Sequence, residues 1–266
     1  MGVGIAHVLL AAGVLVRLVE VDVARAEAAR SAVAASLRRA GERGHLVDPE
    51  GALAGLEVGE QPELVASCDP VIEAAPEDLA LKRDLLRRLE EVVAPTALLA
   101  TNTSSLSIRL LAEPLAHRER FLGMHFFSPV PASQLVEIVR APSSADAAVA
   151  QARSWAELLG KESIVVNDSP GFATRRLGVI AGLEAIRMLE EKVATAVDID
   201  RAMVLGYRHP VGPLRLTDLV GLDVRLHIAR YLSEALGERF RPPELLVAMV
   251  AAGELGKKTG KGFYDW

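Results

Sequence analysis

The fold is decided by three short apolar segments: LLATNTSSL (Leu98–Leu106), FLGMHFF (Phe121–Phe127) and LVEIV (Leu135–Val139). Each contains a run of apolar residues typical of a buried β-strand. Ser104 follows the apolar run of the first segment, His125 lies inside the second segment and Glu137 inside the third. A hydroxyl, an imidazole and a carboxylate are together the groups needed to take a proton from a substrate alcohol.

Outward from these segments, short apolar runs alternate with longer helical patterns over the first 168 residues. The expected strands are Val14–Val21, Val71–Ala75, Leu98–Thr101, Phe121–Phe127, Leu135–Val139 and Ser163–Val166, with a weak one at Leu56–Val58. The expected helices are residues 1–13, Ala24–Gly41, Leu79–Val93 and Ala145–Leu159. Strands separated by helices predict right-handed crossovers and a mostly parallel sheet. The segment Gly51–Ser67 gives no clear assignment beyond its weak strand.

The pattern changes at Asp168–Gly171, and only helical patterns follow. They are Phe172–Glu191, Ala196–Leu205, Leu216–Leu236 and Pro243–Ala252. We therefore predict an α/β domain over residues 1–168 and an all-α domain over residues 169–266. Gly178 and Gly182, four residues apart, predict a strip of close helix packing.

Composition excludes several classes of protein. The chain has 266 residues, a net charge of −5 and one cysteine, Cys68. The single cysteine excludes an intrachain disulfide or a cysteine-based zinc site, and no metal is expected. Interspersed charges argue against nucleic acid or an anionic membrane as the main partner, and no apolar run is long enough to span a membrane. Without a signal-peptide pattern, a cytoplasmic location is expected.

The N-terminal residues MGVGIA (Met1–Ala6) open directly into a helix, and a strand follows that ends at Glu20. A dinucleotide-binding unit has the order strand, Gly-x-Gly-x-x-Gly, helix, strand, acid. Gly2 can be the third glycine and Glu20 the acid that receives the ribose hydroxyls, which favours NAD over NADP. The first strand and first two glycines would then lie upstream of Met1, so we expect an upstream start. Alternatively, Gly2 and Gly4 only allow helix packing.

Beyond these residues, the chain resembles the L-3-hydroxyacyl-CoA dehydrogenase family, of the 3-hydroxybutyryl-CoA dehydrogenase type. The resemblance runs from Gly2 to Trp266. It rests on the segments Met1–Ala6, Val71–Asp78, Asn102–Ser105, Gly123–Phe127, Ser169–Phe172, His209–Pro213, Asp218–Asp223 and Gly256–Tyr264.

The resemblance implies a Rossmann-like, mostly parallel sheet whose first strand is missing, followed by the helical domain. It implies reversible NAD-dependent oxidation of (S)-3-hydroxyacyl-CoA thioesters, in fatty-acid or butanoate-type metabolism, by a homodimer joined through the helical domain. It assigns His125 as the catalytic base, Glu137 as the acid that holds its imidazole and Ser104 as the hydroxyl that binds the substrate oxygen. The residues it places at the cofactor are Gly2, Gly4, Glu20, Glu77, Lys82 and Asn102.

Two positions depart from the family pattern. Ser128 and Arg175 stand where the family usually carries asparagine, and both are expected to contact substrate. Serine is a short polar replacement, whereas arginine is larger, permanently charged and able only to donate. Near His125 it would disfavour the imidazolium; alternatively it could bind a CoA phosphate or pair with Glu137.

Two other functions remain open from sequence. One is a degenerate homologue that binds nucleotide, or serves a structural role, and turns over poorly, which Arg175 and the missing strand suggest. The other is a dehydrogenase of similar build that acts on a hydroxy acid without CoA. The plainest interpretation of His125 alone is a buried histidine with a satisfied hydrogen bond, so its significance depends on Ser104 and Glu137.

Overall fold

The computed structural model describes all 266 residues and divides into two compact units, Met1–Ser169 and Pro170–Trp266. We call the first the α/β unit and the second the helical unit. No helix in either unit has the length and apolar character needed to cross a membrane.

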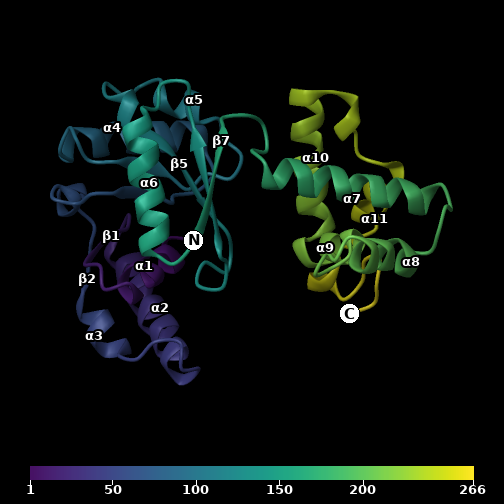
Figure 1. The fold of residues 1–266 in the computed structure, drawn as a ribbon, viewed down its shortest axis with the longest axis horizontal. Helices are drawn as coiled ribbons and strands as arrows, with labels where there is room; N and C mark the ends of the chain where they lie inside the picture. The colour runs from purple at the N-terminus through teal and green to yellow at the C-terminus, as the bar shows by residue number, and fades with distance from the viewer. The chain divides into compact units, whose positions relative to one another are not determined.

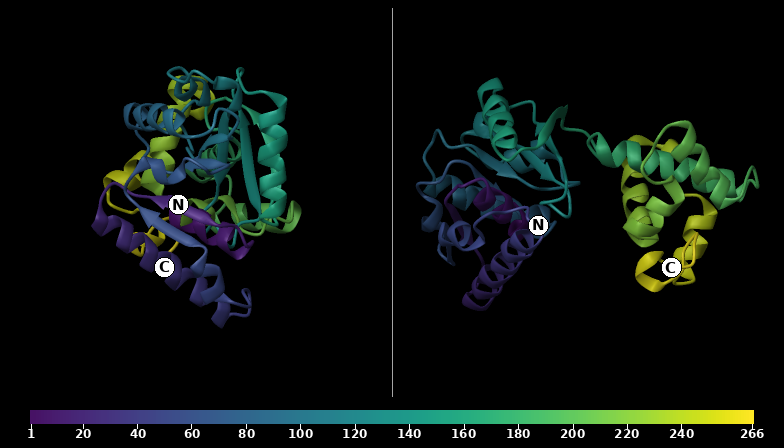
Figure 2. Two further views of the ribbon diagram at one scale, coloured as in Figure 1. Left: turned by 90° about the vertical axis from the view of Figure 1, so that its left-hand side faces the viewer. Right: turned by 60° about the horizontal axis from the view of Figure 1, so that its bottom comes forward.

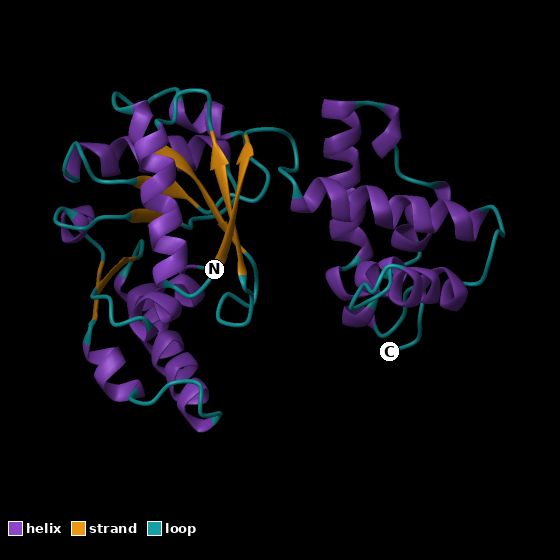
Figure 3. Ribbon diagram, in the orientation of Figure 1, coloured by secondary structure: helices purple, strands orange, loops and turns teal.

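The α/β unit contains two groups of strands, which Figure 3 shows as separate orange arrows. The smaller is a parallel pair of β1 (Val16–Val19) and β2 (Leu56–Gly59). The larger sheet has the order β3-β4-β5-β6-β7. Its strands are β3 (Val71–Glu73), β4 (Leu99–Thr101), β5 (Phe121–Phe126), β6 (Leu135–Arg140) and β7 (Glu162–Asn167). Only β5 and β6 pair antiparallel, so the predicted mostly parallel sheet is confirmed.

Six α-helices accompany these strands (Figure 1): α1 (Gly2–Ala11), α2 (Val23–Glu42), α3 (Pro49–Ala54), α4 (Leu79–Val92), α5 (Ile108–Ala112) and α6 (Asp146–Leu158). Helix α1 joins two apolar clusters. Ile5 and Val8 pack with the core of the five-stranded sheet, whereas Ala6 and Leu10 pack with Val16 of β1. Because one helix is buried on both sides, it holds the two strand groups together in the α/β unit.

The helical unit is a bundle of α7 (Thr174–Glu190), α8 (Ala196–Arg201), α9 (Pro213–Val220), α10 (Leu222–Leu236) and α11 (Glu244–Ala251), seen from two directions in Figure 2. The prediction of one helix over Leu216–Leu236 is wrong. Gly221 has φ +101°, a left-handed value that side-chain-bearing residues rarely adopt, and it separates α9 from α10.

The C-terminal segment is fixed by one buried carboxylate. Asp218, 1% exposed, accepts hydrogen bonds from the backbone N–H groups of Phe263 and Tyr264 and from Nε1 of Trp266, each at 2.9 Å. The turn Gly256–Gly262 thus docks these aromatic residues on the helical unit, and their polar groups are satisfied inside it.

Three of the short helical elements that were not predicted lie in the α/β unit. Helix α3 and a 3₁₀ turn, Pro62–Val65, flank the weakly predicted strand in the unassigned segment, and α5 follows the Asn102–Leu106 loop. All three are at most six residues long, too short to show a helical periodicity in sequence.

Candidate active site

His125 and Glu137 face each other across the antiparallel pair β5–β6. The strand register places them directly opposite, and Nδ1 of His125 lies 2.8 Å from Oε2 of Glu137. His125 is 4% exposed and Glu137 is fully buried. Residues opposite each other in such a pair project from the same sheet face, so the backbone pairing itself brings these two side chains together.

The pairing fixes how the imidazole can react. A carboxylate can only accept, so Nδ1 carries the proton in this hydrogen bond and Nε2 is the nitrogen able to take up a further proton. Once His125 becomes an imidazolium, the buried negative charge of Glu137 stabilises it. The ring of Phe127 packs against the imidazole of His125, with 4.3 Å between the ring centroids, and restricts the tilt of the imidazole. This pair has the parts of a general base.

Ser104 belongs to a loop that is organised around the carboxylate of Glu77. Oε1 of Glu77 accepts hydrogen bonds from the Ser104 N–H at 2.9 Å, the Ser105 N–H at 3.0 Å and the Thr103 hydroxyl at 2.6 Å. The Ser104 hydroxyl itself lies 3.4 Å from the same oxygen. Burial raises the pKa of Glu77, but these hydrogen bonds and the charge of Lys82 outweigh it and hold that pKa below its usual value. Glu77 is therefore an anion that shapes the Ser104 loop.

Lys82 is the next link in this network, and it is 1% exposed. It lies in the first turn of α4, which Asp78 caps by accepting from the Leu81 N–H at 2.8 Å. Its ammonium donates to Oε1 of Glu73 at 2.7 Å and lies 3.6 Å from Oε2 of Glu77. Lys82 thus contacts carboxylates on both sides, with little surface left for a ligand.

Glu73, at the end of β3, is a residue that the sequence analysis did not single out. Its Oε2 accepts from the Thr101 hydroxyl at 2.6 Å, and Thr101 lies directly opposite it in the β3–β4 register. The available signal was a carboxylate inside the apolar run Val71–Ala75, which needs a partner when buried. That partner, nine residues later on α4, could not be identified from spacing alone.

The proposed cofactor residues divide into accessible and structural positions. Glu20 directly follows β1 and is partly exposed, and Gly2 begins α1. A Cβ atom at Gly4 would lie 2.9 Å from the Val130 side chain, so a glycine is needed here because α1 packs closely against Val130. Asn102 uses Oδ1 to accept from the Phe126 N–H at 2.9 Å, which joins the end of β4 to β5.

The two substrate-contact candidates lie in different units. Ser128 is exposed at the end of the β5 segment, before the cis peptide bond to Pro129. Arg175 is the second residue of α7 in the helical unit. The structure therefore brings together His125 with Glu137, and Ser104 with Glu77 and Lys82, inside the α/β unit.

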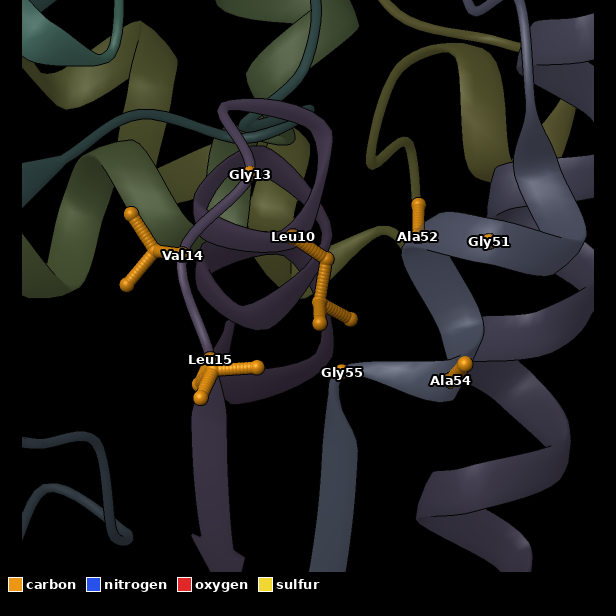
Figure 4. A pocket seen from close by; sticks show the side chains of 8 residues that line it. All are labelled: Leu10, Gly13, Val14, Leu15, Gly51, Ala52, Ala54 and Gly55. Atoms are coloured by element: carbon orange, nitrogen blue, oxygen red, sulfur yellow. The ribbon is translucent and has the colours of Figure 1, made fainter.

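A cavity of about 290 Å³ lies elsewhere, at the C-terminal end of α1 beside α3 (Figure 4). It is lined by Leu10, Gly13, Val14, Leu15, Gly51, Ala52, Ala54 and Gly55. None of these side chains can donate or accept a proton, so this cavity has no part in the chemistry of His125.

Comparison with known proteins gives matches over the whole chain. The family model "3-hydroxyacyl-CoA dehydrogenase, NAD binding domain" matches residues 1–169, and "3-hydroxyacyl-CoA dehydrogenase, C-terminal domain" matches residues 171–266.

Individual relatives match equally broadly. A 3-hydroxybutyryl-CoA dehydrogenase of Mycobacterium tuberculosis is 43% identical over all of this chain and 95% of its own length. The mitochondrial hydroxyacyl-coenzyme A dehydrogenase of Sus scrofa is 36% identical over all of this chain and 88% of its own. The crystal structure of (S)-3-hydroxybutyryl-CoA dehydrogenase from Ralstonia eutropha superposes with a TM-score of 0.94 at 38% identity, covering all of this chain and 95% of the other.

Proposed function

The chain belongs to the 3-hydroxyacyl-CoA dehydrogenase family and is an NAD-dependent oxidoreductase; we propose that His125, Glu137 and Ser104 carry its chemistry on short- to medium-chain substrates. The reaction is the reversible oxidation of the hydroxyl group of a 3-hydroxyacyl-CoA to the ketone. The buried 2.8 Å contact between His125 and Glu137 supports the proposed site most strongly, because it gives a base with a fixed proton-accepting nitrogen.

The residues of the α/β unit fit NAD at two points. The N-terminus of α1 presents backbone N–H groups and the positive end of a helix dipole, both suited to a pyrophosphate. Glu20, after β1, would accept the ribose hydroxyls and repel the 2′-phosphate of NADP. NAD held by these residues would supply the acceptor for the hydride that leaves C3 of the substrate.

The protein's own part in the reaction is to move and hold a proton. Nε2 of His125 takes the proton of the substrate hydroxyl as the C3–H bond breaks, and the electron pair of the O–H bond completes the ketone. Glu137 stabilises the resulting imidazolium through Nδ1. The Ser104 hydroxyl donates to the substrate oxygen and counters the negative charge that develops there. Glu77 keeps the Ser104 loop in place.

The test is oxidation of NADH by acetoacetyl-CoA, followed by the loss of absorbance at ~340 nm. Turnover that requires the CoA thioester is expected, and acetoacetate without CoA should be a poor substrate. NAD binding without turnover would instead favour a degenerate homologue, and equal rates with free acetoacetate would favour a hydroxy-acid dehydrogenase.

Arg175→Asn is expected to raise turnover of acetoacetyl-CoA by about tenfold. The family usually carries asparagine here, and an asparagine amide can both donate a hydrogen bond to a substrate and accept one from it, whereas a guanidinium can only donate. One hydrogen bond gained corresponds to about tenfold. Initial rates with NADH measure the change. Arg230→Asn, an exposed position on α10, is the matched control and should leave the rate unchanged. A rate for Arg175→Asn that is unchanged or lower would contradict this role.

We also propose a cytoplasmic homodimer that associates through the helical unit. This unit presents large apolar side chains to its surface, with Leu177 67%, Leu205 70% and Tyr207 76% exposed. Apolar side chains at this exposure are typical of a surface that a partner covers. The sole cysteine, Cys68, supports the proposed cytoplasmic location, because a chain with one cysteine forms no intrachain disulfide and suits a reducing compartment.

A further inference from the structure

The Ser104 loop, residues 102–107, leads from β4 into α5 and is attached to its surroundings at more than one point. Its first residue, Asn102, accepts a hydrogen bond at Oδ1 from the N–H of Phe126 in β5. The carboxylate of Glu77 holds its middle through backbone N–H groups. The hydroxyl of Ser104 itself makes only a long contact of 3.4 Å with Glu77, so the backbone of the loop determines where that hydroxyl lies.

Asp168 holds the far end of this loop. Its Oδ2 accepts a hydrogen bond from the Ser107 hydroxyl at 2.7 Å and another from the Arg109 N–H at 2.8 Å. The Ser107 oxygen in turn accepts from the Leu110 N–H at 3.3 Å and so caps the N-terminus of α5. Because a charged acceptor makes the stronger kind of hydrogen bond, the carboxylate of Asp168 fixes both the last residue of the loop and the first turn of α5.

Asp168 is itself positioned by β6, the strand that carries Glu137. It follows directly after β7, whose last residue, Asn167, lies opposite Arg140 of β6 in the parallel register. The N–H of Asp168 donates to the Arg140 carbonyl at 2.8 Å and so extends the strand pairing by one step. The Ser104 loop is therefore attached at its end to the strand of Glu137, and at its start to β5, the strand of the proposed base.

A hydroxyl that stabilises developing charge must lie at the position of the reacting oxygen, and an error of about 1 Å can cost roughly 10²-fold in rate. We infer that Asp168 is a positioning residue for the reaction, because it holds the Ser104 hydroxyl at a fixed place relative to the imidazole of His125. Without Asp168 the loop keeps its attachments to β5 and Glu77 but loses the one at its α5 end. The inference rests on the proposed function, since it takes Ser104 as the donor to the substrate oxygen.

Asp168→Ala tests this role through kcat. The variant is expected to lower kcat for the reduction of acetoacetyl-CoA by NADH about tenfold and to change KM by less than about twofold, because the substrate still binds but the donor is misplaced. Asp168→Asn should keep at least about half of the wild-type kcat, since its amide oxygen can accept both hydrogen bonds. Initial rates over a range of acetoacetyl-CoA concentrations at saturating NADH separate kcat from KM, and circular dichroism verifies folding.

Glu90→Ala is the matched control. The carboxylate of Glu90 accepts hydrogen bonds from the N–H groups of Ala116 and His117, each at 2.8 Å, and so anchors a loop that contains no proposed site residue. The variant should melt at a lower temperature than the wild type, as Asp168→Ala should, yet keep the wild-type kcat. A loss of stability by itself would then not explain a loss of kcat.

The effect of Asp168 should disappear when the hydroxyl of Ser104 is absent. Ser104→Ala alone is expected to lower kcat about 10²-fold, the usual cost of removing one such donor. In this background Asp168→Ala should cost less than about twofold more, because the group that Asp168 positions is already gone. A carboxylate that only stabilised the fold would cost the same factor in both backgrounds. Should Asp168→Ala not fold, Ser107→Ala removes one of the two hydrogen bonds and should show the same non-additivity with a smaller loss of about threefold.

Different results would overturn the inference and the proposed function. A wild-type kcat in Asp168→Ala would overturn the inference, as would an equal loss with and without the Ser104 hydroxyl, or a failure of Asp168→Asn to retain activity. Equal losses of kcat in Asp168→Ala and Glu90→Ala would do the same. A wild-type kcat in Ser104→Ala, or no oxidation of NADH by the wild-type enzyme, would overturn the proposed function instead.

Discussion

Replacing His125 with asparagine is expected to lower kcat for (S)-3-hydroxybutyryl-CoA oxidation by about 10²–10⁴-fold, the usual contribution of a positioned general base. Asparagine keeps a polar group of similar reach but cannot take up the substrate proton. Because His125 is buried against Glu137, the variant should retain a hydrogen bond across β5–β6 and therefore fold. Initial rates of NADH formation over a range of pH measure the effect, with circular dichroism to verify folding.

Two companion variants define the cause of that loss. His227→Asn, at an exposed position of α10, should keep the wild-type rate. Glu137→Gln should also lose most activity, because an amide can donate to Nδ1 and so move the imidazole proton to the reacting nitrogen. A rate within about threefold of wild type for His125→Asn would rule out this histidine as the base.

The sequence predicted elements whose signal is local and repeated. The strands around Leu99, Phe121 and Leu135 are mainly apolar, and helices such as α2 and α4 show several turns of periodicity. Their boundaries therefore lie within one or two residues of those expected. The break at Gly221 was missed because apolar residues continue in helical spacing on both sides of it, and only the φ of +101° reveals the turn.

The candidate site was predictable to the extent that it depends on strand register. His125 and Glu137 are twelve residues apart and become neighbours once their strands form an antiparallel pair. The hydrogen bond between Lys82 and Glu73 depends on how α4 packs beside β3, and this packing cannot be predicted from the spacing of residues in the sequence. The burial of Arg225 in α10, where it is 5% exposed, could likewise not be predicted, because an arginine in an amphipathic helix is normally a solvated surface residue.

Lys82→Met is expected to lower the free energy of unfolding by about 3–5 kcal/mol, because it leaves a buried carboxylate without its counter-ion. Lys82 and Glu73 have side-chain exposures of 1% and 0%, and their charged atoms are 2.7 Å apart. Glu73 would retain only neutral donors, the Thr101 hydroxyl and the Ala75 N–H. Methionine fills much of the lysine's volume, so the loss should report the charge more than a cavity.

A control variant and a double variant test whether the lost charge of Lys82 causes this destabilisation. Arg88→Met, on the same helix but 52% exposed, removes a cation that only a surface carboxylate faces and should cost less than about 1 kcal/mol. The double variant Glu73→Leu with Lys82→Met removes both charges and should regain most of the stability that the single variant loses, since apolar pairs can replace buried ion pairs. Urea unfolding followed by circular dichroism gives the three values. A double variant no more stable than Lys82→Met alone would show that the lysine stabilises the fold through packing and not through its ion pair with Glu73.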